Sequence, residues 1–177
     1  MEFSESASAA HAESLPLYQG TGELRLVFRY LPDWRIEEAR GLADRYRQVQ
    51  AWGPRNQDDT YTAHVTVRVS PVKSEGGRYA NVDELVAATR KAIYAGRVDS
   101  ERHTTIAELL AVDQTMSYTL PAVHQPGLKA LPVPVKTRGL FFEREGHLYE
   151  LLFSCDSREY DRNSLAFEQL LRTFKFK

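Results

Sequence analysis

The side chains with the greatest chemical potential in this sequence are its single cysteine, Cys155, and its five histidines. A thiol becomes an effective nucleophile when a base lies within hydrogen-bonding reach. His147 precedes Cys155 in what we predict to be one strand, at a separation on the order of 25 Å, so it cannot be that base. His64 or His103 could approach Cys155 only through the fold. A Cys155-dependent hydrolase is therefore the least favoured alternative, and a small buried apolar role for this thiol is preferred.

The histidines and acidic residues do not show the spacing of a metal site. The five histidines are His11, His64, His103, His124 and His147, and none forms an H-x-x-x-H or H-E-x-x-H pattern. His64 and His147 could meet across a sheet, but exposed histidines on a polar face are the preferred interpretation. Asp156, Glu159 and Asp161 share a stretch that lacks the alternating oxygen ligands and the glycine turn of a calcium loop. We predict no catalytic residue, no metal ligand and no cofactor.

Aromatic and polar side chains that could bind a partner are a better functional lead. The nucleotide patterns G-x-x-x-x-G-K-[ST] and G-x-G-x-x-G do not occur, and neither does G-x-S-x-G. Aromatic residues with arginine neighbours are enriched at interfaces. The candidate binding residues are Trp34, Trp52, His64, Arg68 and Tyr160. Core positions for the two tryptophans remain an equally good interpretation.

The composition limits the classes of partner. The chain has 177 residues, enough for one domain with a real core. Its 23 basic and 24 acidic residues give a net charge of −1, so no basic field favours nucleic acid or an anionic membrane. No apolar run is long enough for a transmembrane segment. We expect a non-enzymatic monomer that binds a protein partner.

The first 17 residues are predicted to be a disordered leader or a remnant of expression cloning. They lack the basic start and the apolar stretch of a signal peptide. Two localisations stay open: extracytoplasmic or membrane-associated if a native export signal was removed, and cytoplasmic otherwise. Residues 18–177 are predicted to form a single domain.

Alternating hydrophobicity predicts three strands in the first half of the chain, over residues 24–30, 45–52 and 61–71. The third is the clearest. It places Tyr61, Ala63, Val65, Val67 and Val69 on one face and Thr62, His64, Thr66 and Arg68 on the other. The second face is therefore predicted to contact water or a ligand. Turns are expected at residues 53–59 and 73–78.

The second half is predicted to contain one helix, then four strands, and a terminal helix. A helix over residues 81–96 would begin with Asn81 as its N-cap and end at Gly96. Strands follow near 104–110 and 113–120, and a proline-rich irregular segment covers 124–135. Glu145-Gly146 predicts a tight hairpin between strands 136–144 and 147–155. A polar loop over 156–164, capped by Asp161 or Asn163, leads to a final amphipathic helix. Antiparallel hairpins with separate helices predict the α+β class.

Several stretches resemble the PsbP-like family. Phe28, Tyr30, Pro32 and Trp34 are similar to the opening F-x-Y-P-x-x-W of that family, with Leu31 inserted. "AHVTVRVSPV" and "NVDELVAATRKAI" resemble its next strand and central helix. The ending is similar at Gly146, Leu148, Tyr149, Tyr160, Phe167, Leu170, Leu171 and Phe174. The resemblance covers residues 18–176, departing at Thr173, where the family has serine, and in the proline-rich 121–137.

The resemblance implies an α/β/α sandwich with a central, mostly antiparallel sheet flanked by helices. It also implies a protein-binding or assembly-accessory module without catalytic residues, as in photosystem-associated PsbP proteins and related bacterial lipoproteins. A small-ligand or metal-binding carrier that uses the polar sheet face around His64 remains the alternative. Shared fold alone does not identify a partner.

Overall fold

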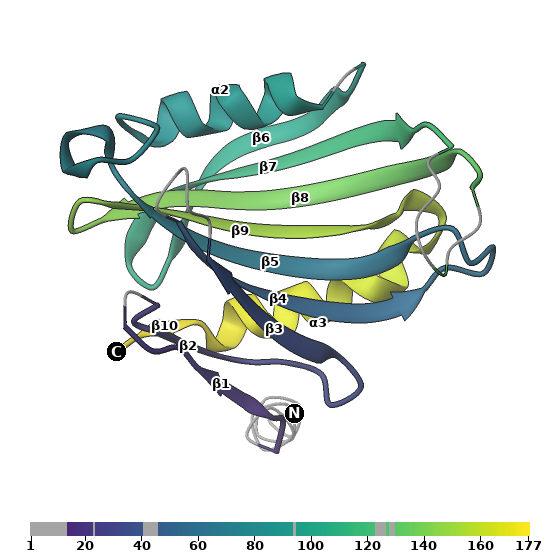
Figure 1. Ribbon diagram of the computed structural model, residues 1–177, viewed down its shortest axis with the longest axis horizontal. Coiled ribbons are helices and arrows are strands. Elements are labelled where there is room, and N and C mark those ends of the chain that lie inside the picture. The colour runs from purple at the N-terminus through teal and green to yellow at the C-terminus, as the bar shows by residue number, and fades with distance from the viewer. Residues whose placement is uncertain (1–13, 23, 41–45, 94, 123–126, 128–129) are drawn as a thin grey trace, which may run out of the picture.

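The protein is built on a seven-stranded antiparallel sheet (Figure 1). The computed structural model describes residues 14–22, 24–40, 46–93, 95–122, 127 and 130–177. The strand order is β3-β4-β5-β9-β8-β7-β6. The strands are β3 (Arg35–Arg40), β4 (Arg47–Arg55), β5 (Thr62–Pro71), β6 (Arg97–Ile106), β7 (Leu109–Leu120), β8 (Val133–Arg144) and β9 (His147–Asp156).

A small second sheet and two α-helices complete the fold. The small sheet joins β1 (Leu17–Gln19), β2 (Leu26–Arg29) and β10 (Lys175–Phe176) in the order β1-β2-β10. The helices are α2 (Val82–Ala92) and α3 (Tyr160–Thr173), and single 3₁₀ turns occur at η1 (Lys73–Glu75) and η2 (Ser157–Glu159). No helix in the described ranges combines the length and the apolar composition needed to cross a bilayer. The antiparallel sheets and separate helices confirm the α+β class.

The two faces of the large sheet carry different helices. On one face, Val65 and Val67 of β5 pack in the main core with Leu151 and Phe153 of β9, under the apolar side of α3. On the opposite face, α2 forms a smaller cluster with its residues Leu85 and Val86 and with Val112, Phe141 and Leu148 of the sheet. The α2 helix is short, so polar side chains of β5 and β9 remain next to it.

Two local signals predicted from the sequence are confirmed. The Asn81 side chain accepts a hydrogen bond from the Glu84 backbone N–H at the start of α2. Glu145 and Gly146 adopt φ angles of 51° and 72° in the β8–β9 turn, the left-handed conformation that two-residue hairpins require. The turn fixes the register of β8 against β9, and with it the face on which each β9 side chain lies.

Several predicted boundaries are wrong. The α2 helix ends at Ala92, before Gly96, because Ile93 is extended. The segment 156–164 is not a loop, since Asp156 caps the turn η2 and α3 follows at once from Tyr160. The predicted strand 104–110 contains the turn between β6 and β7 at Ala107 and Glu108.

Some strands were missed, and two further predictions can be compared with the structure only in part. The strands β3 and the first half of β6 were not predicted. Residues 133–135 of the proline-rich segment are the start of β8, whereas 123–126 and 128–129 lie outside the described residues. The leader prediction also falls largely outside them, because the description begins at residue 14 and β1 begins at Leu17.

Candidate functional site

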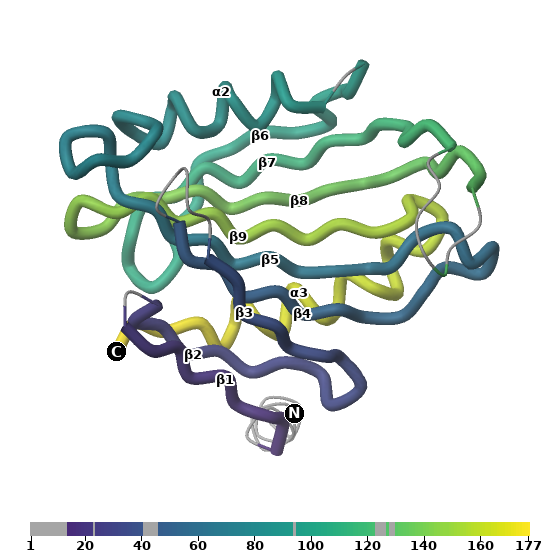
Figure 2. The backbone as a smooth tube through the Cα atoms, in the orientation of Figure 1, coloured from purple at the N-terminus to yellow at the C-terminus, as the bar shows by residue number. Residues whose placement is uncertain are grey.

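A cavity of about 410 Å³ lies between α2 and the polar face of the large sheet. In the backbone trace of Figure 2, α2 runs along the β6 and β7 side of the large sheet. The lining residues come from β5, β7, β8, β9, α2, the segment before α2, and single residues next to β4, β5 and α2. They are Tyr46, Tyr61, His64, Thr66, Arg68, Ser70, Arg78, Tyr79, Leu85, Ala88, Thr89, Ala92, Ile93, Tyr118, Thr137, Glu150, Leu152 and Ser154. We call it the α2 cavity.

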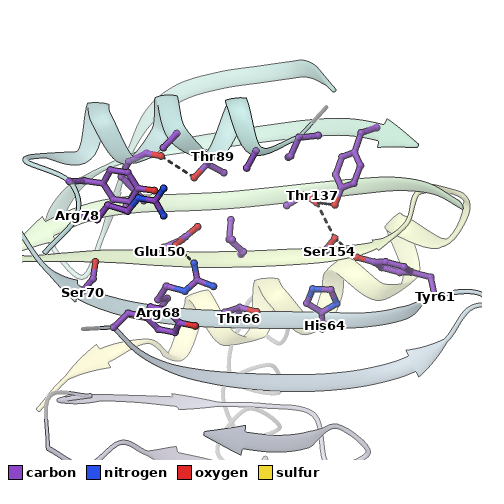
Figure 3. Close-up of a pocket in the computed structure, with 18 residues that line it drawn as sticks. Tyr61, His64, Thr66, Arg68, Ser70, Arg78, Thr89, Thr137, Glu150 and Ser154 are labelled. Atoms are coloured by element: carbon purple, nitrogen blue, oxygen red, sulfur yellow. Dashed lines mark hydrogen bonds and ion pairs between the residues drawn. The ribbon is translucent and has the colours of Figure 1, made fainter. Parts of the chain in front are cut away.

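One end of the α2 cavity contains an ion pair (Figure 3). Strand register places Arg68 of β5 opposite Glu150 of β9, and Arg68 Nη1 lies 3.3 Å from Glu150 Oε2. Arg68 Nε and Nη2 both donate to Gln48 Oε1, at 3.2 and 3.1 Å, and its guanidinium lies 4.6 Å from the centre of the Tyr46 ring. Burial raises the pKa of Glu150, and the charge of Arg68 opposes that rise.

The other end of the α2 cavity carries a chain of hydroxyl groups. The Ser154 hydroxyl lies 2.9 Å from the Tyr61 hydroxyl and 3.0 Å from the Thr137 hydroxyl. Thr137 Oγ1 in turn lies 3.4 Å from the Tyr118 hydroxyl. Burial raises the pKa of Tyr61, so its phenol stays protonated at neutral pH. Hydroxyl groups can act as donors or acceptors, so this end can adapt to a polar ligand atom.

His64 lies beside this hydroxyl end and is held in place by its neighbours. Its ring centre is 5.1 Å from that of Trp52 and 5.8 Å from that of Tyr61. Its Nδ1 is 3.1 Å from the Thr62 carbonyl oxygen, so the neutral ring donates from Nδ1. Burial lowers the pKa of His64, which keeps the ring neutral at physiological pH and leaves Nε2 as an acceptor.

The wall opposite these polar groups is apolar. Leu85, Ala88 and Ala92 of α2 face the cavity, and Leu152 of β9 contributes to the floor between the two polar ends. A site that combines an apolar wall with a few fixed polar groups is typical of small-ligand binding.

The predicted binding residues separate into three places. His64 and Arg68 line the α2 cavity together. Trp52 lies beside His64, and its Nε1 donates to Glu37 Oε2 at 2.9 Å. Tyr160 packs against Phe153 on the other side of the sheet, and the centres of the two rings are 5.6 Å apart.

Trp34 is buried, unlike an exposed aromatic residue of an interface. Its side chain is buried in the main core, at 5% exposure. A Cβ atom on Gly53 would lie 2.5 Å from the Trp34 ring, which shows how closely the indole packs over the β4 backbone. Trp34 therefore has the core role that the sequence left open.

Cys155 and His64 point to opposite faces of the sheet. Cys155 is fully buried in the main core with Leu151 and Phe153, whereas His64 lines the α2 cavity. Burial, with smaller contributions from Asp156 and Glu159, raises the pKa of the Cys155 thiol to about 12. The geometry thus disfavours a Cys155-dependent hydrolase. Within the described part of the chain, no three His, Cys, Asp or Glu side chains are grouped so as to hold a metal ion.

We expect Cys155 in the folded protein to react with iodoacetamide at pH 7 on the order of a thousandfold more slowly than in the urea-unfolded chain. Both burial and the raised thiol pKa reduce the concentration of accessible thiolate. Mass spectrometry of timed samples measures both rates. Equal rates in the folded and unfolded chain would restore the hydrolase alternative.

The comparison with known proteins rests on structure. No family model and no curated protein matches the sequence. The cyanobacterial PsbP (CyanoP) of Synechocystis sp. PCC 6803 superposes with a TM-score of 0.59 and 13% identity over 93% of each chain. LpqN of Mycobacterium tuberculosis, described as involved in cell envelope biogenesis, superposes with a TM-score of 0.54 and 12% identity, over 97% of this chain and 96% of LpqN. The chain has a PsbP-like fold.

A third solved structure shows the same fold within a longer protein. A Bacteroides thetaiotaomicron protein superposes with a TM-score of 0.54 and 11% identity, over 91% of this chain and 48% of its own. At sequence identities this low, the superpositions establish the fold and leave the role open. In this PsbP-like fold, the opening stretch that suggested the resemblance is structural: Phe28 and Trp34 are both buried.

Most of the α2 cavity was not predicted from the sequence. Neither Glu150 nor Ser154 was among the predicted binding residues, and neither was paired with Arg68 or His64. The structure pairs these four residues directly, as Arg68 with Glu150 and His64 with Ser154. The available signal was the four-residue spacing of polar residues on each of two strands. These are His64 and Arg68 on β5, and Glu150 and Ser154 on β9.

Proposed function

We propose that this chain is a non-enzymatic binding or assembly-accessory module of the PsbP-like type, with its helices and sheet arranged as an α/β/α sandwich. Its binding site is the α2 cavity. The observation that carries the proposal is that Arg68 and His64 of β5 and Glu150 of β9 converge on one cavity. Their positions are fixed by neighbouring side chains, as a preorganised binding site requires.

The hydrogen bonds in the α2 cavity support binding over catalysis. A serine nucleophile requires a base as its hydrogen-bond partner. The described partners of the Ser154 hydroxyl are the hydroxyl groups of Tyr61 and Thr137, and His64 Nδ1 is directed to the Thr62 carbonyl. LpqN has the same fold and is described as involved in cell envelope biogenesis, which agrees with an accessory role for this chain.

A pull-down with the purified chain as bait tests the protein-binding form of this proposal. We expect the wild type to enrich one assembly from extract of its source, and Arg68→Ala and Trp52→Ala each to reduce that enrichment by about tenfold or more. Mass spectrometry with isotope labels measures the ratio. Leu110→Ala is the matched control because Leu110 is 68% exposed on β7, away from the cavity lining. Equal capture by folded Arg68→Ala and wild type would contradict the proposal.

A small-ligand carrier is the second candidate, and the size of the cavity favours it. A volume of about 410 Å³ falls within the range of roughly 300–1,000 Å³ typical of small-molecule sites. The cavity also has the required combination of an apolar wall and two polar ends. A protein partner could reach the same groups only with an inserted side chain or terminus.

A further inference from the structure

We propose that the α2 cavity binds a small monocarboxylate with an oxygen at its far end, the carboxylate on Arg68 and the far oxygen on the hydroxyls of Tyr61, Ser154 and Thr137. This inference rests on the proposed function in its small-ligand form. It follows from the separation of two polar ends by an apolar wall inside one cavity (Figure 3).

Arg68 has the geometry of a carboxylate receptor. Gln48 and the Tyr46 ring hold its guanidinium in one orientation. Its contact with Glu150, at 3.3 Å, is longer than the roughly 2.7–2.9 Å of a strong charge-assisted hydrogen bond. The described bonds use one N–H on each guanidinium nitrogen, which leaves a second N–H on both Nη1 and Nη2. Paired N–H groups of this kind bind a carboxylate in bidentate fashion.

The charges around Arg68 favour an anionic ligand. Two arginines, Arg68 and Arg78, line the cavity with a single acidic residue, Glu150. Glu150 is 6% exposed, and its burial already favours the protonated acid. When a ligand carboxylate enters, Glu150 can take up a proton and release Arg68 to the ligand. A cationic ligand would instead meet the repulsion of both arginines.

The spacing of the two polar ends sets the length of the ligand. The Arg68–Glu150 pair and the His64–Ser154 pair lie four residues apart on the same two strands, which corresponds to about 13 Å. An extended chain advances roughly 1.2 Å per bond, so about ten carbons bridge the two ends. Leu152, Leu85 and Ala88 line the space between them and would contact the methylene groups of the ligand.

Calorimetric titration with 10-hydroxydecanoate tests the inference directly. We expect the wild type to bind it, Arg68→Gln to bind at least about tenfold more weakly, and Glu150→Gln several-fold more tightly, because that change removes the competing carboxylate. Ser154→Ala should weaken 10-hydroxydecanoate by about fivefold and leave decanoate unchanged. Decane-1,10-diol, which lacks the carboxylate, should bind about tenfold more weakly than the acid.

Two controls keep these titrations interpretable. Arg97→Gln, a change to a 79% exposed arginine on β6, should bind like the wild type. Arg68→Lys, which retains the positive charge but lacks the paired N–H groups, replaces Arg68→Gln if that variant does not fold by circular dichroism, and should show a loss of about threefold or more.

The titrations test the ligand and the pull-down tests the binding module, so either claim can be contradicted without the other. Lack of wild-type binding to 10-hydroxydecanoate, equal affinity for the diol, or weaker binding by Glu150→Gln would each overturn the inference. If Arg68→Ala still reduces capture of a partner, the proposed binding module stands without this ligand. If changes at Arg68 alter neither measurement, both the inference and the proposed function fail.

Discussion

Replacing Phe142 with alanine is expected to lower the free energy of unfolding by about 4 kcal/mol. The Phe142 side chain is fully buried and its ring stacks on Tyr149, with ring centres 5.0 Å apart. It also makes edge contacts with Phe174 and Phe176, at 5.9 and 6.1 Å. The substitution removes buried apolar area and leaves a cavity that these rings cannot fill. Urea unfolding followed by circular dichroism measures the change.

Two matched variants show whether the cause is the aromatic packing. Phe142→Leu retains most of the buried volume and should cost less than about 2 kcal/mol. Leu110→Ala removes an exposed side chain from the neighbouring strand β7 and should change stability by less than about 0.5 kcal/mol. A loss below about 1 kcal/mol in Phe142→Ala would contradict the expected contribution of this ring to the core.

The same core explains why the opposite face of the sheet is free to bind. On one face, α3 and the small sheet cover the apolar side chains of β5 and β9. On the other face, α2 covers only the region near Val112, Phe141 and Leu148. Stability therefore comes mainly from one face, which leaves the polar residues of the second face available for a ligand.

The central strands could be predicted from sequence because both the pattern and its cause are local. In β5, alternate residues enter the core, and the valines mark that face without knowledge of the neighbours. The two edge strands, β3 and β6, could not be predicted in the same way. Arg35–Arg40 and Arg97–His103 are mostly charged and exposed, as edge strands often are because charge prevents pairing with other chains.

The turn between β6 and β7 and the start of α3 could not be predicted for a different reason. Ala107 and Glu108 adopt φ angles of 46° and 68° without the glycine or asparagine that usually marks a hairpin. At α3, the first turn is polar, and its start at Tyr160 depends on a side chain of β9, Asp156, that caps the preceding η2 turn. In both places the surrounding structure overrides weak local preferences.

The α2 cavity was partly predictable for a related reason. The polar side of β5 identified His64 and Arg68 as ligand-facing, and both line the cavity. Glu150 and Ser154 were not predicted, because their partners depend on strand register across a long sequence separation. Register follows from the turn and the hydrophobic faces together, so it is not visible in any single segment.

The second large effect is expected at Asp156, where replacement with alanine should lower the free energy of unfolding by about 3 kcal/mol. Asp156 is 2% exposed and accepts hydrogen bonds from Asn56 Nδ2 at 2.7 Å and from the Arg158 backbone N–H at 2.9 Å. Asn56 in turn accepts from the backbone N–H groups of Thr60 and Tyr61. Removing the carboxylate takes one of two acceptors from the buried Asn56 amide, which keeps only Thr60 Oγ1 at 2.7 Å, and weakens the attachment of the loop before β5.

The stability supplied by Asp156 should also depend on pH in a defined direction. Hydrogen bonds from Arg158 and Asn56 lower the pKa of Asp156 to about 2, against the opposing effect of burial. The folded state therefore binds this proton more weakly than the unfolded chain, whose aspartate pKa is about 3.9. The contribution, about 2.6 kcal/mol, is fully present above about pH 5, and about 2 kcal/mol of it is lost as the pH falls to 2.

Urea unfolding of the wild type and Asp156→Asn between pH 2 and pH 7 measures this contribution. We expect the difference in unfolding free energy between the two to shrink by about 2 kcal/mol as the pH falls from 5 to 2. Asp33→Asn, at an exposed position, should keep a difference from the wild type below about 0.5 kcal/mol throughout. A constant difference for Asp156→Asn would mean that hydrogen bonding alone, without the negative charge, fixes the β4–β5 loop beside the hydroxyl end of the α2 cavity. A shrinking difference would mean that the negative charge of Asp156 adds stability beyond hydrogen bonding, through its bonds to Asn56 and Arg158, which fix the β4–β5 loop that precedes Tyr61.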